Sequence, residues 1–226
     1  MSVTEEVVVL KAADGHAFDG FIVRAKGSAK GGLVILQEIF GVTNQLKSVA
    51  RSYAESGFNV VVPALFDRLS PKTVVPFDEA ERGRGLAFGL DPEHIKLDVS
   101  AAMSAVSTEA GASLMGFCWG GGQAYALACS LDCVSAVAFY GTALKKHIAA
   151  CENKPSCPML FHFGTQDDHT PQDVVDDVRA ILPLAEIHLY EAGHAFANDV
   201  RPAYVADAAT SAHARSLEFL LENHAR

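Results

Sequence analysis

The sequence predicts an α/β fold in which one domain spans residues 1–226, with a mostly parallel central sheet, an antiparallel start and helices on both faces. Two observations lead to this prediction. From residue 33 onward, continuous apolar runs alternate with helical stretches, and runs without polar alternation are typical of parallel strands covered on both faces. Before them, Asp14-Gly15 separates two amphipathic stretches, which indicates a β-hairpin.

We expect the hairpin strands at residues 7–10 and 17–23. The later strands share a continuous apolar character and are expected at residues 33–36, 60–62, 113–116, 134–140, 159–163 and 187–190. A chain of 226 residues with 50% hydrophobic residues can bury one large core.

Helix starts are marked at two places. Asn44 is the expected N-cap of a helix over residues 45–56, and Asp91 with Pro92 begins a helix that reaches about Val106. Further helices are expected after Trp119, after Pro171 and over residues 206–221.

The charge balance disfavours two classes of partner. Lys+Arg 18 against Asp+Glu 27 gives a formal net charge of -9, which opposes binding to nucleic acid or to an anionic membrane. The acidic N-terminus lacks the pattern of a secretory signal, so we expect a cytoplasmic protein. Its partner is expected to be a small-molecule substrate, and the chain to be a monomer or a small homo-oligomer.

Five cysteines without a secretion signal predict free thiols in a reducing compartment rather than a disulfide framework. Two spacings, Cys129-x3-Cys133 and Cys151-x5-Cys157, can be drawn as zinc pairs, but neither matches the usual short ligand hairpins. We therefore expect no metal and no cofactor.

The segment Gly116-Phe117-Cys118-Trp119-Gly120 follows an apolar run and has the pattern of a nucleophile elbow with sulfur in place of oxygen. Small residues two before and two after the nucleophile let the chain make this sharp turn from strand to helix. The competing interpretation is a glycine-rich turn in which Cys118 is a buried small hydrophobic residue.

In α/β-hydrolases the nucleophile is followed along the chain by an acid and then by a histidine. His194 comes just after the last expected strand, where a loop brings a general base to the carboxyl edge of the sheet. Asp167 and Asp168 follow the strand before it. An acid here would hold the imidazole tautomer that accepts the thiol proton, and chemistry alone does not separate the two carboxylates.

Residues 37–41, Gln-Glu-Ile-Phe-Gly, take the place of the oxyanion loop. The expected donors are the backbone N–H groups of Ile39 and Trp119. Glu38 is unusual there, since a carboxylate in a dry site needs a partner, for which the thiol and Arg82 are candidates. Its alternative interpretation is a solvated loop glutamate.

Together, the segments 37–41 and 116–121, the Gln166-Asp167 loop and Gly193-His194-Ala195-Phe196 resemble the dienelactone hydrolase family. The resemblance runs from the first hairpin to the C-terminal helix and implies the α/β-hydrolase fold. It also implies a triad of Cys118, His194 and Asp167, with Asp167 preferred over Asp168, and a Glu38 that exchanges a proton with the thiol as substrate enters.

The implied reaction is hydrolysis of a small lactone or carboxylic ester, of the carboxymethylenebutenolidase type, through an acyl-enzyme on Cys118. Dienelactone-cleaving members bind the substrate carboxylate with an arginine, a serine and a second arginine. Arg82 matches the first arginine, whereas the positions of the serine and the second arginine are occupied by Ala195 and Asn198. Arg201 is a possible substitute. Phe40, Trp119, Tyr140 and Phe196 are candidates for the wall of an apolar pocket, of which Phe40 and Tyr140 are the ones we expect to contact substrate.

Three alternatives stay open. The first is a related carboxylesterase with another small ester as substrate. The second is a catalytically silent scaffold on which Cys118 is a redox-sensing or ligand-binding thiol. The third is a metal hydrolase that uses Asp167, Asp168, His169 and His194, although their spacing fits no short zinc motif.

Overall fold

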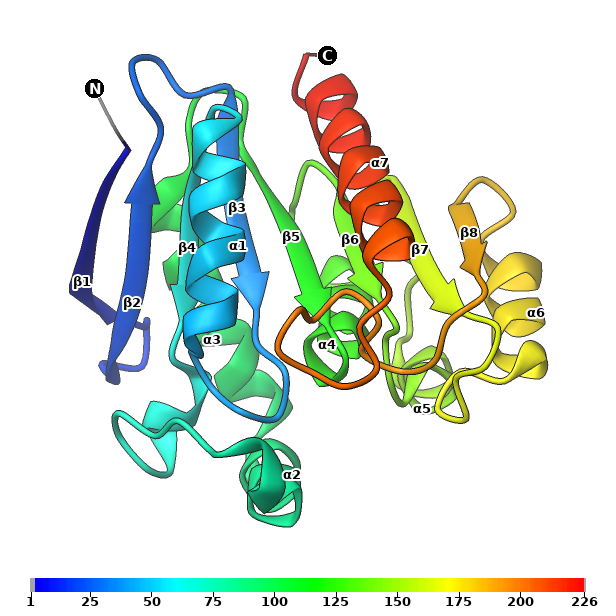
Figure 1. The fold of residues 1–226 in the computed structure, drawn as a ribbon. Coiled ribbons are helices and arrows are strands. Elements are labelled where there is room, and N and C mark those ends of the chain that lie inside the picture. Colours follow the sequence, from blue (N-terminus) through cyan, green and yellow to red (C-terminus); the bar gives the residue numbers. More distant parts are fainter. Residues whose placement is uncertain (1–2, 226) are drawn as a thin grey trace. The chain divides into compact units, whose positions relative to one another are not determined.

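A computed structural model describes residues 3–225, and the chain divides into two compact units, residues 1–113 and 114–226. Each unit contains four strands with helices packed against them (Figure 1). That all of residues 1–226 form a single domain stays a prediction.

The first unit carries four strands: β1 (Thr4–Lys11), β2 (Ala17–Arg24), β3 (Gly31–Leu36) and β4 (Phe58–Pro63). Their order is β1-β2-β4-β3, in which β1 pairs antiparallel with β2, β2 antiparallel with β4, and β3 parallel with β4. The predicted hairpin and antiparallel start are confirmed. Its turn contains Gly15 at a φ of 90°, a conformation that glycine adopts without steric cost.

The second unit contains the strands β5 (Ala112–Phe117), β6 (Ala136–Phe139), β7 (Met159–Gly164) and β8 (Glu186–Tyr190), of which β5 begins two residues before the boundary. Neighbours in the order β5-β6-β7-β8 are all parallel. Every residue of β5 and of β7 is buried, as their apolar runs predict. Burial on both faces is wrong for β8, where Glu186 is exposed and Leu189 keeps 40% of its surface, because β8 is the last strand of the order.

Helices flank the strands of each unit. The helices are α1 (Asn44–Glu55), α2 (Ala80–Gly89), α3 (Pro92–Val106), α4 (Trp119–Ala128), α5 (Leu144–Ala150), α6 (Gln172–Ile181) and α7 (Ala206–His224), with two 3₁₀ turns at Leu65–Arg68 and Phe77–Glu79. In Figure 1, α1 lies in front of the strands of the first unit and α3 behind them, while α7 lies in front of the strands of the second unit and α4 behind. The predicted helices on both faces are confirmed.

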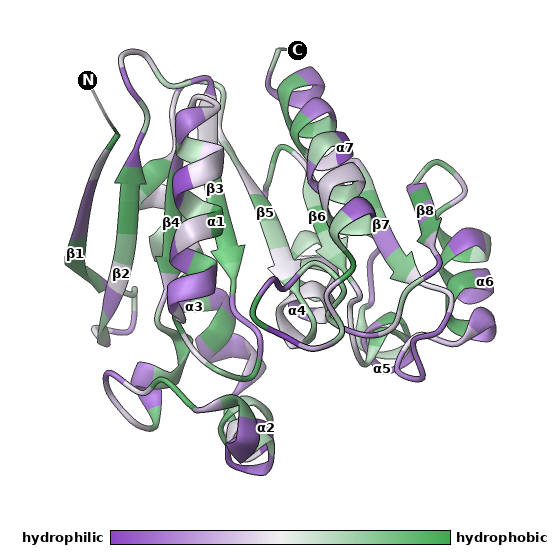
Figure 2. Ribbon diagram, in the orientation of Figure 1, coloured by the Kyte–Doolittle hydropathy of each residue, from purple (hydrophilic) through white to green (hydrophobic). Residues whose placement is uncertain are grey.

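Burial follows the sequence pattern. In Figure 2, β3 is hydrophobic toward its arrowhead, whereas α1 shows hydrophilic residues interspersed with hydrophobic ones. All six residues of β3 are buried, and α1 buries only one side, including Leu46 and Tyr53. This is the arrangement of a strand covered on both faces by amphipathic helices.

The helix starts were predicted with one error. Asp91 caps α3, since its side chain accepts a hydrogen bond from the Glu93 backbone N–H at 2.8 Å. The N-cap of α1, however, is Thr43 and not Asn44, because the Thr43 hydroxyl accepts from the Leu46 N–H at 3.3 Å.

Two helices lack a start signal and were not predicted. Within α2, glycines at three of ten positions lower the helix propensity, and α5 is only seven residues long and begins after Ala143 in a left-handed conformation. Among residues 3–225, none of the helices combines the length and apolar character needed to cross a bilayer.

Candidate active site

Cys118 lies on a sharp turn between the last residue of β5 and the first residue of α4. Its backbone has φ 55° and ψ −117°, a region that residues with a side chain rarely adopt. The turn is held by hydrogen bonds: the Cys118 N–H donates to the Phe139 carbonyl at 3.0 Å, and its carbonyl accepts from the N–H groups of Gly121 and Thr142, each at 3.0 Å. The sharp strand-to-helix turn predicted at Cys118 is therefore present.

The glycines around Cys118 are required by close backbone approach. A Cβ added to Gly116 would lie 1.9 Å from the Gly120 carbonyl oxygen, inside any allowed contact distance. At Gly121 a Cβ would lie 2.8 Å from the Phe139 carbonyl oxygen of β6. The glycine run thus lets α4 pack closely against β6, the strand beside β5. This close packing explains why α4 begins with glycines although they have a poor helix propensity.

His194 lies beside the Cys118 sulfur. The distance from His194 Nε2 to Cys118 Sγ is 3.1 Å, and the distance from His194 Nδ1 to an oxygen of Asp167, Oδ2, is 2.8 Å. The three side chains come from the turn after β5, the loop after β8 and the loop after β7, and all belong to the second unit. Parallel strands bring the residues that follow their carboxyl ends to one edge of a sheet, so the topology explains why these three side chains lie together.

Burial and hydrogen bonding separate the two candidate acids. Asp167 is 4% exposed. Its Oδ2 contacts His194 Nδ1, and its Oδ1 accepts a hydrogen bond from the His169 backbone N–H at 2.8 Å. Asp168 is exposed to solvent. Within residues 3–225, no three histidine, cysteine or acidic side chains converge in a way that could hold a metal ion.

The electrostatics of the site favour a protonated His194. Burial opposes this charge, but the hydrogen bonds to Asp167 and Cys118 outweigh it and raise the pKa of His194 to about 10. For Asp167, burial raises the pKa, whereas the hydrogen bond to His194 lowers it, and the net direction is downward. A carboxylate on one side and a sulfur on the other therefore stabilise an imidazolium between them.

The loops that carry Asp167 and His194 are tied to each other. The Gln166 N–H donates to the Ala192 carbonyl at 3.0 Å, and the Thr165 N–H donates to the Tyr190 carbonyl at 2.8 Å. These bonds continue the β7–β8 pairing into the loops. The acid and the histidine are thus held by backbone contacts as well as by their own hydrogen bond.

Behind these loops lies a buried polar group that the sequence did not reveal. His162 of β7 is 0% exposed, and its ring nitrogens lie 2.9 Å from the Tyr190 hydroxyl and 2.9 Å from the Ser216 hydroxyl. It links β7, β8 and α7. Burial holds the pKa of His162 well below its ordinary value, so the ring is neutral and structural. A lone histidine within an apolar run was the only signal for it.

Aromatic rings surround the His194 imidazole. Tyr140, fully buried, meets it edge-on with centroids 5.2 Å apart, and His169 lies on it with centroids 4.5 Å apart. Phe196 packs against Tyr140 at 5.3 Å. The structure brings Tyr140 to His194, and it also brings His169 there, which the sequence grouped with His194 only in the metal-hydrolase alternative.

Glu38, Ile39 and Phe40 follow β3 in the first unit, and all three are buried. The interpretation of Glu38 as a solvated loop residue is wrong, since it is 4% exposed. Its loop is anchored on both sides: the Leu65 N–H donates to the side-chain oxygen of Gln37 at 3.2 Å, and Phe40 meets another ring, Phe77, edge-on at 4.7 Å.

Arg82 lies on α2, also in the first unit. Its guanidinium pairs with Glu79 at 3.0 Å, and 53% of the side chain is exposed. The next residue, Gly83, packs so closely on the Ile39 carbonyl that an added Cβ would lie 2.1 Å from that oxygen. The helix carrying Arg82 is therefore fixed to the expected oxyanion loop.

The two departures from the family pattern have structural roles after His194. Ala195 is buried and adopts a φ of 65°, and Asn198 is 1% exposed with a side-chain oxygen that accepts the Val200 N–H at 3.3 Å. Arg201 follows in a turn in which its N–H donates to the Asn198 carbonyl at 3.0 Å. Asn198 thus closes the loop.

The alternating strands and helices, the sharp turn at Cys118 and the histidine after β8 are those of the α/β-hydrolase fold. Comparison with solved structures confirms this fold. A putative dienelactone hydrolase from Klebsiella pneumoniae superimposes with a TM-score of 0.84 at 24% identity, covering 96% of this chain and 98% of that one. An alpha-beta serine hydrolase homologue from Coxiella burnetii gives a TM-score of 0.64 at 16% identity, with 99% and 98% covered.

The family follows from the sequence comparison. The model of the dienelactone hydrolase family matches residues 18–224, and the chain is 31% identical over 226 residues to a carboxymethylenebutenolidase of Pseudomonas putida, with 95% of each chain covered. This chain therefore belongs to the dienelactone hydrolase family, which confirms the resemblance read from its motifs and makes it a hydrolase of that family.

Proposed function

We propose that this protein hydrolyses a small lactone or carboxylic ester through a thioester on Cys118, with His194 and Asp167 completing a catalytic triad. The observation that carries the proposal is the continuous line of short contacts, Asp167 Oδ2 to His194 Nδ1 at 2.8 Å and His194 Nε2 to Cys118 Sγ at 3.1 Å. Nucleophile and base within hydrogen-bond reach, with the base oriented by a third group, are the requirements of nucleophilic catalysis.

In the acylation step, the Cys118 sulfur attacks the substrate carbonyl and its proton resides on His194. The amides of Ile39 and Trp119 are the proposed donors to the oxyanion. Trp119 begins α4, and N–H groups at a helix start point toward the N-terminal end, where Cys118 lies. His194 then gives its proton to the leaving alkoxide, which leaves a thioester.

In the deacylation step, His194 removes a proton from water, which attacks the thioester and releases the carboxylate. Asp167 keeps the His194 proton on Nδ1 in the neutral state and stabilises the imidazolium in the charged state. Glu38 is the proposed second acid, which exchanges a proton with the Cys118 thiol as substrate enters.

We propose an anionic lactone as substrate, because Arg82 matches the arginine with which family members hold a carboxylate, and Phe40 and Tyr140 as apolar contacts. The named activity of the Pseudomonas putida relative supports this choice. We expect no nucleic-acid or membrane partner.

A second candidate is a carboxylesterase for a neutral ester. It is favoured by Ala195 and Asn198, which lack a hydroxyl and a positive charge, and by the use of the Asn198 side chain to close its own loop. Loss of one charge-assisted contact costs on the order of 1.5 to 3 kcal/mol, enough to change the preferred substrate.

The test is kcat/KM for dienelactone beside a neutral ester of similar size, measured with wild type, Cys118→Ala and Cys129→Ala. Cys129 is the matched control because it is a part-exposed cysteine at the other end of α4. We expect turnover at the background rate for Cys118→Ala and wild-type turnover for Cys129→Ala.

Preference for the anionic lactone supports the first candidate, and preference for the neutral ester supports the second. Turnover that survives in Cys118→Ala would contradict the cysteine mechanism. If wild type turns over neither substrate while Cys118 oxidises rapidly and reversibly, the silent thiol is the better interpretation.

A further inference from the structure

Two cysteines outside the active site touch each other. The sulfur atoms of Cys133 and Cys157 are 3.2 Å apart, although 24 residues separate them in the chain. This is not the pairing that sequence spacing suggested, in which Cys133 would join Cys129. The contact lies in the second unit, where the segments leading into β6 and β7 run side by side.

The backbone holds these two segments in register. The Ala136 N–H donates to the Pro158 carbonyl at 3.0 Å, and the first residues of the two strands, Ala136 and Met159, are direct partners. Both cysteines lie in irregular chain just before the strands, where a small local shift breaks no helix or ladder hydrogen bond. A disulfide needs its sulfur atoms at about 2.05 Å, so the thiols need to move only slightly.

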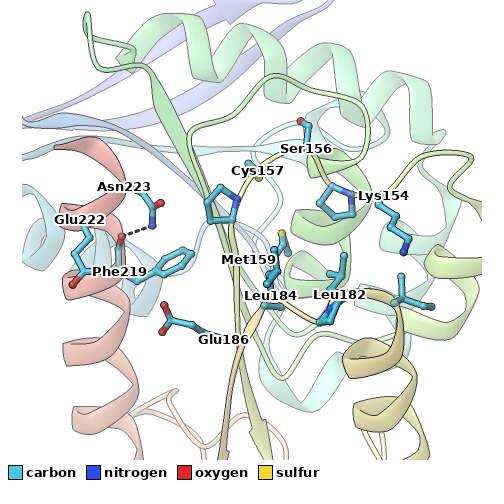
Figure 3. A pocket seen from close by; sticks show the side chains of 15 residues that line it. Lys154, Ser156, Cys157, Met159, Leu182, Leu184, Glu186, Phe219, Glu222 and Asn223 are labelled. Atoms are coloured by element: carbon cyan, nitrogen blue, oxygen red, sulfur yellow. Dashed lines mark hydrogen bonds between the residues drawn. The ribbon is translucent and has the colours of Figure 1, made fainter. Parts of the chain in front are cut away.

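The two thiols differ in access. Cys133 is 6% exposed, whereas Cys157 is part-exposed and lines a cavity of about 560 Å³ together with residues such as Met159 and Phe219 (Figure 3). A small molecule in this cavity therefore reaches Cys157 first.

The two thiols also differ in acidity. The hydrogen bond from Cys133 lowers the pKa of Cys157, while the same contact, together with burial, raises the pKa of Cys133. The thiolate is the reactive form of cysteine, so the accessible member of the pair is also the nucleophilic one.

We propose that Cys133 and Cys157 are a dithiol site that hydrogen peroxide oxidises to a reversible disulfide. The Cys157 thiolate attacks a peroxide oxygen, which cleaves the O–O bond, releases water after protonation and leaves a sulfenic acid. The Cys133 sulfur then attacks the Cys157 sulfur, forms the S–S bond and displaces a second water. Two thiols are oxidised and one peroxide is reduced to two waters, so the step balances.

This site is separate from the proposed catalytic one. Cys157 precedes the amino end of β7, whereas Asp167 follows its carboxyl end. Cys129 provides an internal comparison, because burial and a hydrogen bond with Cys151 raise the pKa of Cys129 to about 12, which makes it a poor nucleophile.

The test treats the full-length Cys118→Ala protein, reduced beforehand, with hydrogen peroxide, and maps thiols and disulfides by mass spectrometry. This background removes the cysteine of the candidate active site. Cleavage before Asp132, after Lys146 and after Glu152 places Cys129, Cys133, Cys151 and Cys157 on four separate peptides, so the cross-linked pair is read directly. We expect one Cys133–Cys157 cross-link, a loss of two alkylatable thiols, and recovery of both with dithiothreitol.

Single variants test the order of the steps. Cys133→Ser should lose the cross-link but accumulate a sulfenic acid on Cys157, trapped by dimedone, while Cys157→Ser should lose both signals. Cys129→Ser, the matched control, should retain the cross-link. The proposal is overturned if Cys133 and Cys157 stay fully alkylatable at a peroxide dose that oxidises Cys118 in wild type, or if Cys157 links to Cys129 or Cys151 instead.

Discussion

His194 Nε2 lies 3.1 Å from Cys118 Sγ although 76 residues separate the two in the chain. The Nδ1 of His194 contacts Asp167 Oδ2, and the imidazole ring packs against the rings of Tyr140 and His169. These three neighbours fix the direction in which Nε2 points.

Asp167→Asn should lower kcat/KM by about 10⁴-fold, because an amide no longer selects the imidazole tautomer or stabilises the imidazolium. Asp168→Asn is the matched control, since Asp168 is exposed, and should stay near wild type. Ester hydrolysis followed at neutral pH measures both. Equal losses in the two variants would contradict the assignment of Asp167.

The stability of the fold should depend on pH through His194. Its folded pKa, about 10, is above the ordinary 6.5, so its contribution is complete below pH 6.5 and is lost as the pH rises toward 10. The pKa of Asp167 is lowered, so its contribution is present above its ordinary 3.8 and is lost as the pH falls through the folded value.

Urea unfolding of wild type and His194→Gln at pH 6, 8 and 10 measures this dependence. The free energy of unfolding of wild type minus that of His194→Gln should decrease steadily from pH 6 to pH 10. A difference that does not change between pH 6 and 10 would show that the pair does not stabilise the imidazolium.

Gly116→Ala should destabilise the protein by at least about 3 kcal/mol, because the new methyl group would lie 1.9 Å from the Gly120 carbonyl oxygen. Gly85→Ala is the control: it lies within α2 with no atom within 4 Å of an added Cβ, and should stabilise by up to about 1 kcal/mol. Thermal and urea unfolding followed by circular dichroism distinguish the two. A neutral Gly116→Ala would contradict the tight elbow.

Arg82→Ala should lower kcat/KM for an anionic lactone roughly ten- to a hundredfold while leaving a neutral ester unchanged, because one charge-assisted contact is removed. Arg84→Ala is closely matched, since both arginines lie on α2 and each pairs with a glutamate three residues earlier. It should affect neither substrate. A similar loss on both substrates in Arg82→Ala would point to a structural role for this side chain.

Local sequence determined much of this protein. Strand runs such as residues 33–36, the Asp14-Gly15 turn, the Asp91-Pro92 helix start and the glycines around Cys118 were all predicted, because each depends on the propensity or size of neighbouring residues. The order of Cys118, Asp167 and His194 along the chain predicted that they lie close together, because the loops that follow parallel strands gather at one edge of the sheet.

Tertiary structure decided what depends on distant neighbours. The contact between Cys133 and Cys157 and the bridge from His162 to Ser216 are set by which chain segments pack together, so the neighbouring residues do not reveal the partners. Packing also decided between the two interpretations of Glu38 in favour of burial. Helix α2 shows the same limit: its glycines oppose a helix locally, but Gly83 fits against the Ile39 carbonyl where a larger residue could not, and that packing offsets the weak propensity.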